Sequence, residues 1–371
     1  MLGARRPQRA AIIGIVVLLG AGAAAGTRVR AATPTRPLVW VNAYGTYAVR
    51  TDGTRWTQLN DCSLTPVASN GRRLIGGFGY LQDREAPLVI MPADRQIDVD
   101  CDSGPRTPPV LPYRLRVRGS GASSWSTLAW SPDGRRILAV GTFGEGSQSR
   151  ARSVVFNANG AGYHVVDPRL DGVSSSVTDA AWSSHGDRVV LGRVFRSSDC
   201  PEFAETKTIG IACQRSELVV AKADGSDARS LYRPPQIEAS QRDDLPAGSP
   251  LRSLPSPLFA PFGWHADRIF FTVYDDRDGS QRIASIREDG SGLRYVTARG
   301  GELQRPALSP DGRQIALIWS PPGKASGLYL LGSAGGPLRK VTVRQPLTST
   351  TCGGSGKTCT GRNIGFGHVT W

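Results

Sequence analysis

The triplet Gly356-Lys357-Thr358 is the segment that most resembles a nucleotide-binding motif. A phosphate-binding loop needs a further glycine five residues earlier, between a strand and a helix, because its backbone N–H groups must wrap the phosphate. Thr351 occupies that position, and the triplet stands in a short Gly/Ser-rich stretch between Cys352 and Cys359. The spacing therefore predicts an ordinary loop here and no nucleotide cofactor.

Residues 274–279 (YDDRDG) have the carboxylates of a calcium loop but not its spacing. Their aspartates do not alternate as calcium ligands do, and no glutamate follows at the distal position. The chain also has no Gly-x-Ser-x-Gly elbow, the turn that presents a catalytic serine in many hydrolases. We expect a turn at 274–279, no metal ion and no serine nucleophile.

Histidine and cysteine are the remaining residue types with ready chemistry. The four histidines, at widely separated positions, are predicted to be turn or packing residues: His164, His185, His265 and His368. The six cysteines fall in three sequential couples: Cys62 and Cys101, Cys200 and Cys213, Cys352 and Cys359. No couple has the C-x-x-C spacing of a zinc site, and an even count in an exported chain favours disulfides. Each couple brackets one loop or insertion, so we expect pairing within the couples, which is one of the fifteen arrangements that six cysteines allow.

Residues 1–30 predict export. Arg5, Arg6 and Arg9 precede a small and apolar segment from Ala10 to Ala25, without an acid among the first nine residues. A basic region before an apolar region of this length is typical of a signal peptide, and Ala23-Ala24-Ala25 offers a cleavage site. The segment is slightly shorter than the roughly 20 apolar residues of a membrane span, but it could stay uncleaved as a signal anchor. Either reading places the rest of the chain outside the cytoplasm, secreted, periplasmic or anchored to the membrane.

One segment recurs along the chain and indicates the fold. The sequence AWSPDGRRILA at 129–139 returns as AWSSHGDRVVL at 181–191 and as ALSPDGRQIAL at 307–317, with degenerate copies at 68–75 and 263–270. In the copies at 129–139 and 307–317 an apolar strand ends at Trp or Leu, proline sets φ, aspartate caps the turn and glycine takes positive φ; the copy at 181–191 keeps the glycine but has Ser184-His185 in place of Pro-Asp. The pattern predicts a tight hairpin between two strands, a and b.

A second hairpin signal follows downstream of these copies. Asp-Gly or Asn-Gly between apolar runs occurs at 52–53, 159–160, 224–225 and 289–290, with a looser version at 331–336. These dipeptides are the strongest short hairpin signals. Each unit therefore has four strands, a to d, and four-stranded units repeated every 40–50 residues or so predict the blades of a β-propeller.

Five units are complete and a sixth is split between the two ends of the repeat region. The a-strands lie near residues 65, 126, 178, 260 and 304; the split unit has three strands, Leu38–Asn42, Thr46–Arg50 and Arg55–Leu59, and an a-strand in 364–371. Because an open ring would expose a strand edge, we expect the C-terminal strand to pair with the N-terminal blade. The prediction is an all-β, six-bladed β-propeller over residues 38–371. The tryptophans at the end of strand a are expected to fill the core between blades: Trp130, Trp182, Trp264 and Trp371.

The a–b hairpin resembles the PD40 (WD40-like) repeat of the TolB-type propellers, periplasmic scaffolds of the Tol–Pal system. The resemblance rests on the Ser-Pro-Asp-Gly turns at 131–134 and 309–312 and covers residues 38–371. It implies a six-bladed propeller with a binding role. No segment matches the α/β domain that precedes the propeller in that family, so the resemblance carries over no partner.

The formal net charge of +14 comes mostly from arginine, since only five of the 45 basic residues are lysine. The charge is scattered, with no dense basic run among aromatic residues, so no nucleic-acid partner is expected. We expect a non-enzymatic, extracytoplasmic scaffold that binds a protein or a cell-envelope component, on the propeller face near the insertions at about 196–214 and 235–258.

The alternative is a carbohydrate-active or lyase-type propeller enzyme with its site at the channel mouth. Acids and histidines that converge in the channel would favour the enzyme, and a channel lined by backbone and small residues would favour the scaffold.

Overall fold

The structure is a computed structural model, and it describes residues 38–42, 46–54, 56–60, 67–77, 88–93, 113–115, 117, 121–144, 149–166, 175–196, 214–233, 259–274, 281–297, 302–320, 326–342 and 368–371. All of these belong to the compact unit Arg36–Trp371, and the other unit, Met1–Thr35, contains none of them. No helix within the described ranges is long and apolar enough to cross a membrane.

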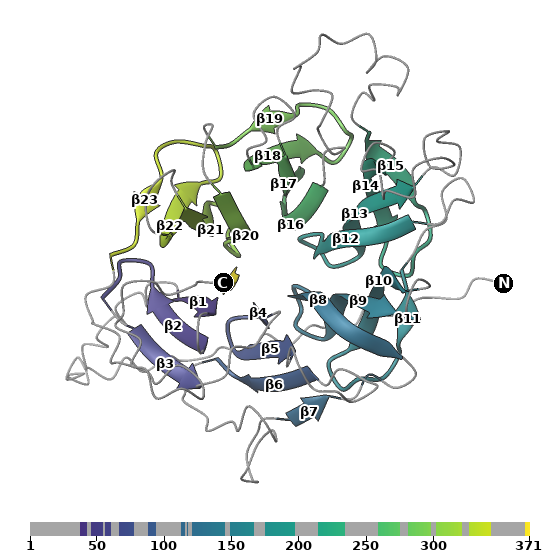
Figure 1. The fold of residues 1–371 in the computed structure, drawn as a ribbon, viewed down its shortest axis with the longest axis horizontal. Helices are drawn as coiled ribbons and strands as arrows, with labels where there is room; N and C mark the ends of the chain where they lie inside the picture. Colours follow the sequence, from purple (N-terminus) through teal and green to yellow (C-terminus); the bar gives the residue numbers. More distant parts are fainter. Residues whose placement is uncertain are drawn as a thin grey trace, which may run out of the picture. The chain divides into compact units, whose positions relative to one another are not determined.

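The described strands form six four-stranded antiparallel sheets that surround a common centre (Figure 1). Blade 1 is β24 (His368–Thr370), β1 (Leu38–Asn42), β2 (Thr46–Arg50) and β3 (Trp56–Asn60). Blade 2 is β4 (Val67–Ser69), β5 (Arg73–Gly77), β6 (Leu88–Pro92) and β7 (Tyr113–Leu115). Blade 3 is β8 (Ala122–Trp130), β9 (Arg136–Phe143), β10 (Arg150–Asn157) and β11 (His164–Val165).

The other three blades follow in chain order. Blade 4 is β12 (Ser175–Trp182), β13 (Arg188–Arg196), β14 (Gln214–Lys222) and β15 (Arg229–Tyr232). Blade 5 is β16 (Phe259–His265), β17 (Arg268–Tyr274), β18 (Gln281–Arg287) and β19 (Arg294–Tyr295). Blade 6 is β20 (Glu302–Leu308), β21 (Gln314–Ser320), β22 (Gly327–Gly332) and β23 (Arg339–Lys340). The six-bladed propeller predicted from the repeats is confirmed.

The ring closes through β24, as the split unit predicts. In the antiparallel pairing of β24 with β1, Trp40 lies opposite Thr370 and Val41 opposite Val369. Figure 1 shows β24 beside the centre of the ring, where the innermost strands of the other blades also lie. One detail differs from the expectation: the third strand of the split blade runs over Trp56–Asn60 rather than Arg55–Leu59. That strand pairs with β2 through a register irregularity between Thr46 and Tyr47, which a repeat pattern does not reveal.

The a–b turns have the chemistry that their sequence predicts. In blade 3 the Ser131 hydroxyl donates to Asp133 Oδ1 at 2.6 Å, and the Arg135 N–H donates to the same oxygen at 3.0 Å. These two bonds lower the pKa of the Asp133 carboxyl below its ordinary value. Gly134 has φ 66° and Gly312, at the same place in blade 6, has φ 68°, so both occupy the left-handed region as predicted.

The hydrophobic core lies between blades rather than within them. Each buried cluster combines residues from two successive blades: blades 2 and 3, 3 and 4, 4 and 5, 5 and 6, and 6 and 1. The closing strand takes part, because Val369 and Trp371 pack with Val39 of β1 and with Ile318 and Leu328 of blade 6. Each blade therefore buries its faces only against its neighbours, as in other propellers.

Many arginines join neighbouring blades through neutral acceptors. At the first position of strand b, Arg73 lies over the ring of Trp130 at 4.8 Å, and Arg136 lies over Trp182 at 5.0 Å. Each also donates to the carbonyl oxygen of the turn glycine in the next blade, Gly134 for Arg73 and Gly186 for Arg136. We call each such pair an arginine clamp.

A second set of contacts between blades follows the outermost strands. Each of these rim contacts joins strand d to a backbone oxygen in the c–d turn of the next blade: His164 to Ala223 (3.0 Å), Arg229 to Glu288 (2.6 Å), Arg294 to Ser333 (3.4 Å) and Arg339 to Thr51 (3.2 Å). Part of the basic charge of the chain is therefore structural.

Candidate binding cavity

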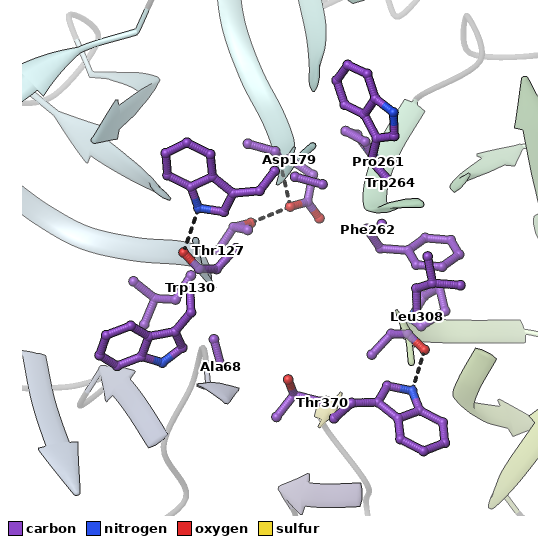
Figure 2. A pocket seen from close by; sticks show the side chains of 18 of the residues that line it. Ala68, Thr127, Trp130, Asp179, Pro261, Phe262, Trp264, Leu308 and Thr370 are labelled. Carbon is purple, nitrogen blue, oxygen red and sulfur yellow. Dashed lines mark hydrogen bonds between the residues drawn. The ribbon is translucent and has the colours of Figure 1, made fainter. Parts of the chain in front are cut away.

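A cavity of about 910 Å³ lies where the innermost strands of all six blades meet. Its wall is formed mainly by β4, β8, β12, β16, β20 and β24 and by residues of the a–b turns, and Thr272 of β17 and Gln281 of β18 also line it. Figure 2 shows side chains from these strands around an open centre. The volume is in the range of sites that hold a small ligand or the end of a polypeptide segment.

Bulges in the innermost strands place polar side chains in this wall. The register shifts between Trp125 and Thr127 in β8, and between Val177 and Asp179 in β12. A bulge interrupts the strict alternation of faces and re-aims the residues that follow it. Thr127 and Asp179 consequently meet across the boundary between blades 3 and 4, where the Thr127 hydroxyl donates to Asp179 Oδ1 at 2.7 Å (Figure 2).

The innermost strands of blades 4 and 5 lie very close together in the cavity wall. The Thr178 hydroxyl lies 2.5 Å from the carbonyl oxygen of Phe259 and 3.0 Å from that of Gly192. A Cβ at Gly192 would lie 2.1 Å from the Phe259 oxygen, so only glycine permits this approach. The wall is therefore closely packed where blades 4 and 5 meet.

The repeat tryptophans contribute to both core and wall. Trp130, Trp182, Trp264 and Trp371 line the cavity, but each is only 6–7% exposed. The Trp182 indole N–H donates to the Ala129 oxygen of blade 3 at 3.1 Å, and the Trp371 indole N–H to the Ala307 oxygen of blade 6 at 2.8 Å. These rings are fixed between blades, in agreement with the expected core role, and present little open face to a ligand.

The structure does not gather the four histidines. His265, at the end of β16, lines the cavity. His164 makes a rim contact on β11, His185 is exposed in the a–b turn of blade 4, and the backbone of His368 pairs with Asn42. Within the described ranges no three His, Cys, Asp or Glu side chains form a cluster that could hold a metal ion.

Asp179 is the one carboxylate among the described residues of the wall, and the sequence reasoning did not single it out. A usable signal existed, because Thr127 and Asp179 both stand three residues before the repeat tryptophan of their blade. Alternating faces would not have brought the two side chains together without the bulges.

Several predicted features lie outside the described residues. These are the signal or anchor segment 1–30, all six cysteines, the triplet Gly356-Lys357-Thr358, and residues 275–279 of the carboxylate-rich turn. Tyr274 ends β17 and Gln281 begins β18, so residues 275–280 connect strands b and c of blade 5.

Comparison with known proteins agrees on the fold. No protein-family profile matches the chain. Among solved structures, the putative TolB of Agrobacterium tumefaciens aligns over 83% of this chain and 88% of its own, at 13% identity with a TM-score of 0.50. TolB of Acinetobacter baumannii aligns over 80% of this chain and 65% of its own, at 14% identity with a TM-score of 0.47. The alignment with the Agrobacterium tumefaciens structure agrees with the β-propeller fold that the six sheets of this chain define.

One curated relative matches part of the chain. An uncharacterized peptidase of Bacillus subtilis, YuxL, is 32% identical over 113 residues, which are 29% of this chain and 17% of the relative. The match thus covers about a sixth of that protein and concerns a segment of the fold.

Proposed function

We propose that this chain is a non-catalytic binding scaffold that acts outside the cytoplasm. It receives a segment of a protein partner in the cavity between the innermost strands of the blades. The observation that carries the proposal is the composition of the cavity wall. Small, hydroxyl-bearing and apolar side chains dominate it, with one carboxylate, Asp179, and one imidazole, His265, among the described lining residues. Such a wall offers hydrogen bonds and apolar contact, which suits recognition of an extended peptide segment.

The same wall gives little support to acid–base chemistry. Hydrolysis of a glycosidic bond needs two carboxylates that flank it, and general acid–base catalysis by a lyase needs a positioned acid and base. Asp179 comes from blade 4, where it accepts a bond from Thr127, and His265 comes from blade 5. Sugar stacking also needs exposed aromatic faces, whereas the four tryptophans of the wall are 6–7% exposed.

The proposed location rests on the sequence of residues 1–30, with its arginines followed by an apolar segment. An exported scaffold would keep its cysteines oxidised, and we expect disulfides within the three couples. The partner class that fits is a protein, or a cell-envelope component that carries a peptide.

Site-specific photo-crosslinking in the native envelope tests the proposal. Phe262 lines the cavity and Tyr295 lies exposed on β19, so a photoreactive phenylalanine at each position compares two aromatic sites on one blade. We expect a discrete crosslinked partner from position 262 and none from position 295. Thr370→Trp, which fills the cavity from β24, should abolish the crosslink. Equal crosslinking from both positions, or a crosslink that survives Thr370→Trp, would contradict the proposal.

The peptidase description of the Bacillus subtilis relative makes peptide hydrolysis the second candidate. Purified protein is incubated with a library of fluorogenic peptides, alongside the variants Asp179→Asn and His265→Gln. The scaffold proposal expects no turnover from any of the three. Turnover that is lost in either variant would replace the scaffold by an enzyme.

A further inference from the structure

Three arginines lie on the face of blade 5 that is turned toward blade 6. Arg268 begins β17, Arg287 ends β18 and Arg294 begins β19. Arg268 pairs with Arg287 in the ladder, and Ser285 pairs with Arg294, so the four side chains share one face of the sheet. In Figure 1 these strands form the blade next to β20–β23.

Two of these guanidinium groups converge on one hydroxyl. Arg268 places its Nε 3.3 Å and its Nη2 3.2 Å from Ser285 Oγ, and Arg294 places its Nε 3.1 Å from the same oxygen. Ser285 is fully buried, while Arg294 is exposed. The serine therefore anchors the inner ends of two cationic groups whose outer edges face solvent.

The other acceptors of these two arginines are neutral as well. Arg268 Nη2 donates to the Gly292 oxygen at 2.7 Å, and Arg294 Nη2 contacts the Ser333 oxygen of blade 6 at 3.4 Å. The acid paired with the cluster among the described residues is Asp267, 3.6 Å from Arg287. Burial, and then the neighbouring charge of Arg294, lower the pKa of Arg268. Three cations thus share one solvent-exposed carboxylate.

The equivalent arginines of other blades are committed to other partners. Arg73 and Arg136 form arginine clamps on tryptophan, and Arg188 of blade 4 forms an ion pair with Glu288. Arg268 has no ring to cover, because Leu308 replaces the repeat tryptophan in blade 6. It turns back onto its own blade instead and adds its charge to that of Arg294.

We propose that Arg268, Arg287 and Arg294 form a binding site for a tetrahedral oxyanion, a phosphate or sulfate group, at the outer edge between blades 5 and 6. Guanidinium groups present paired N–H donors that match the oxygens of such an anion. Arg287, with a side chain 54% exposed, and Arg294 make the first contacts, and Arg268 supplies charge from beneath. A doubly charged phosphate balances the excess of the three arginines over Asp267.

Isothermal titration with inorganic phosphate tests the site, with sodium chloride added to keep ionic strength constant. We expect saturable binding by the wild type and a loss of affinity of roughly tenfold or more in Arg294→Gln and in Arg287→Gln. Arg339→Gln is the matched control. Arg339 holds the same ladder position in blade 6 and makes its own rim contact, but Gln314, Gly332 and Leu330 stand where Arg268, Arg287 and Ser285 stand in blade 5. Its affinity for phosphate should equal that of the wild type.

A second arm distinguishes the sources of the phosphate group. Co-sedimentation with phosphatidylglycerol vesicles, with phosphatidylcholine vesicles as reference, reports binding to a lipid phosphate, and competition by free phosphate shows that the two use one site. Saturable binding of free phosphate without vesicle binding assigns the site to a soluble phosphate group. Absence of saturable phosphate binding, equal affinity in Arg294→Gln and wild type, or an equal loss in Arg339→Gln would each overturn the proposal.

Discussion

At the interface between blades 3 and 4, Arg136 lies over the ring of Trp182 and bonds to the oxygen of Gly186. At the interface between blades 5 and 6, Leu308 stands in the place of that tryptophan, and Arg268 turns away to Ser285. At this second interface, glycine backbone lies very close to side chains of the neighbouring blade. A Cβ at Gly263 would lie 2.6 Å from Leu308 Cβ, and one at Gly312 would lie 2.1 Å from the ring of His265.

The comparison shows that one repeat position can serve two purposes. Where the next blade offers an indole ring, the arginine contributes to packing, and its charge is attracted to the electron-rich face of the ring. Where the ring is absent, the blades also approach closely at Gly263 and Gly312, and the charge of the arginine remains available to a ligand. The arginines of this chain therefore serve different roles in different blades.

The largest effect is expected from removing the ring itself. Trp182→Ala opens a cavity between blades 3 and 4 and deletes the bond to the Ala129 oxygen, so it should cost about 3–5 kcal/mol of unfolding free energy. Leu308→Ala, at a half-buried site, should cost about 1–2 kcal/mol. Urea unfolding followed by fluorescence measures both. Equal losses would show that the two interfaces pack alike.

Replacing a turn glycine should destabilise the protein more at the interface between blades 5 and 6, where the glycine lies very close to its neighbour. Gly312→Ala combines positive φ with a clash against the His265 ring and should cost about 3 kcal/mol. Gly134→Ala has the same φ strain, but its nearest neighbour is the movable Asn70 side chain at 3.0 Å, so about 1 kcal/mol is expected. Thermal unfolding of the two variants decides the order, and a larger loss at Gly134 would contradict it.

Replacing the first arginine of strand b should give a smaller difference in unfolding free energy between the two interfaces. Arg136→Met removes a cation–π contact and a bond to the next blade, and should cost about 1 kcal/mol. Arg268→Met also relieves repulsion by Arg294 and Arg287, so its net effect should stay within about 0.5 kcal/mol of zero. Denaturant titration at low and high salt provides the measurement. A loss at Arg268 that matches the loss at Arg136 would mean that both arginines mainly serve packing.

Acid should act on both regions alike, because their a–b turns share one chemistry. The Ser309 hydroxyl and the Arg313 N–H lower the pKa of Asp311, as Ser131 and Arg135 do for Asp133. A carboxyl with a lowered folded pKa stabilises the fold fully above its unfolded value of about 4, and this contribution is lost as pH falls through the folded value. The small stability gaps between wild type and Asp133→Asn or Asp311→Asn should therefore narrow together in acid. A gap that closes for one variant alone would show that the two turns differ.

The sequence was sufficient to predict the features that depend on local chemistry. The Ser-Pro-Asp-Gly turns, the strands on either side of them and the closure by residues 368–370 all follow from the repeat and are present in the structure. Contacts that depend on the register between strands could not be predicted from the sequence. The bond between Thr127 and Asp179 requires two bulges, and the convergence of Arg268 and Arg294 on Ser285 requires a known ladder alignment across three strands. The shared repeat position of Thr127 and Asp179 does not reveal that the two side chains meet, and the spacing of the arginines does not reveal their convergence.

The origin of β24 has a consequence for the order in which the molecule can form. Blade 1 receives its innermost strand from residues 368–370, so a chain that leaves the ribosome or crosses a membrane in order has five blades available before this strand arrives. Until then, the inner edge of β1 and the exposed flanks of blades 1 and 6 are unprotected and open to aggregation. The final pairing joins residues 38–42 to residues 368–370, which are far apart in the sequence, and contacts of such sequence separation form slowly. Pairing of residues 368–370 with β1 thus completes the ring, and any factor that shields the open ring would have to leave before this pairing forms.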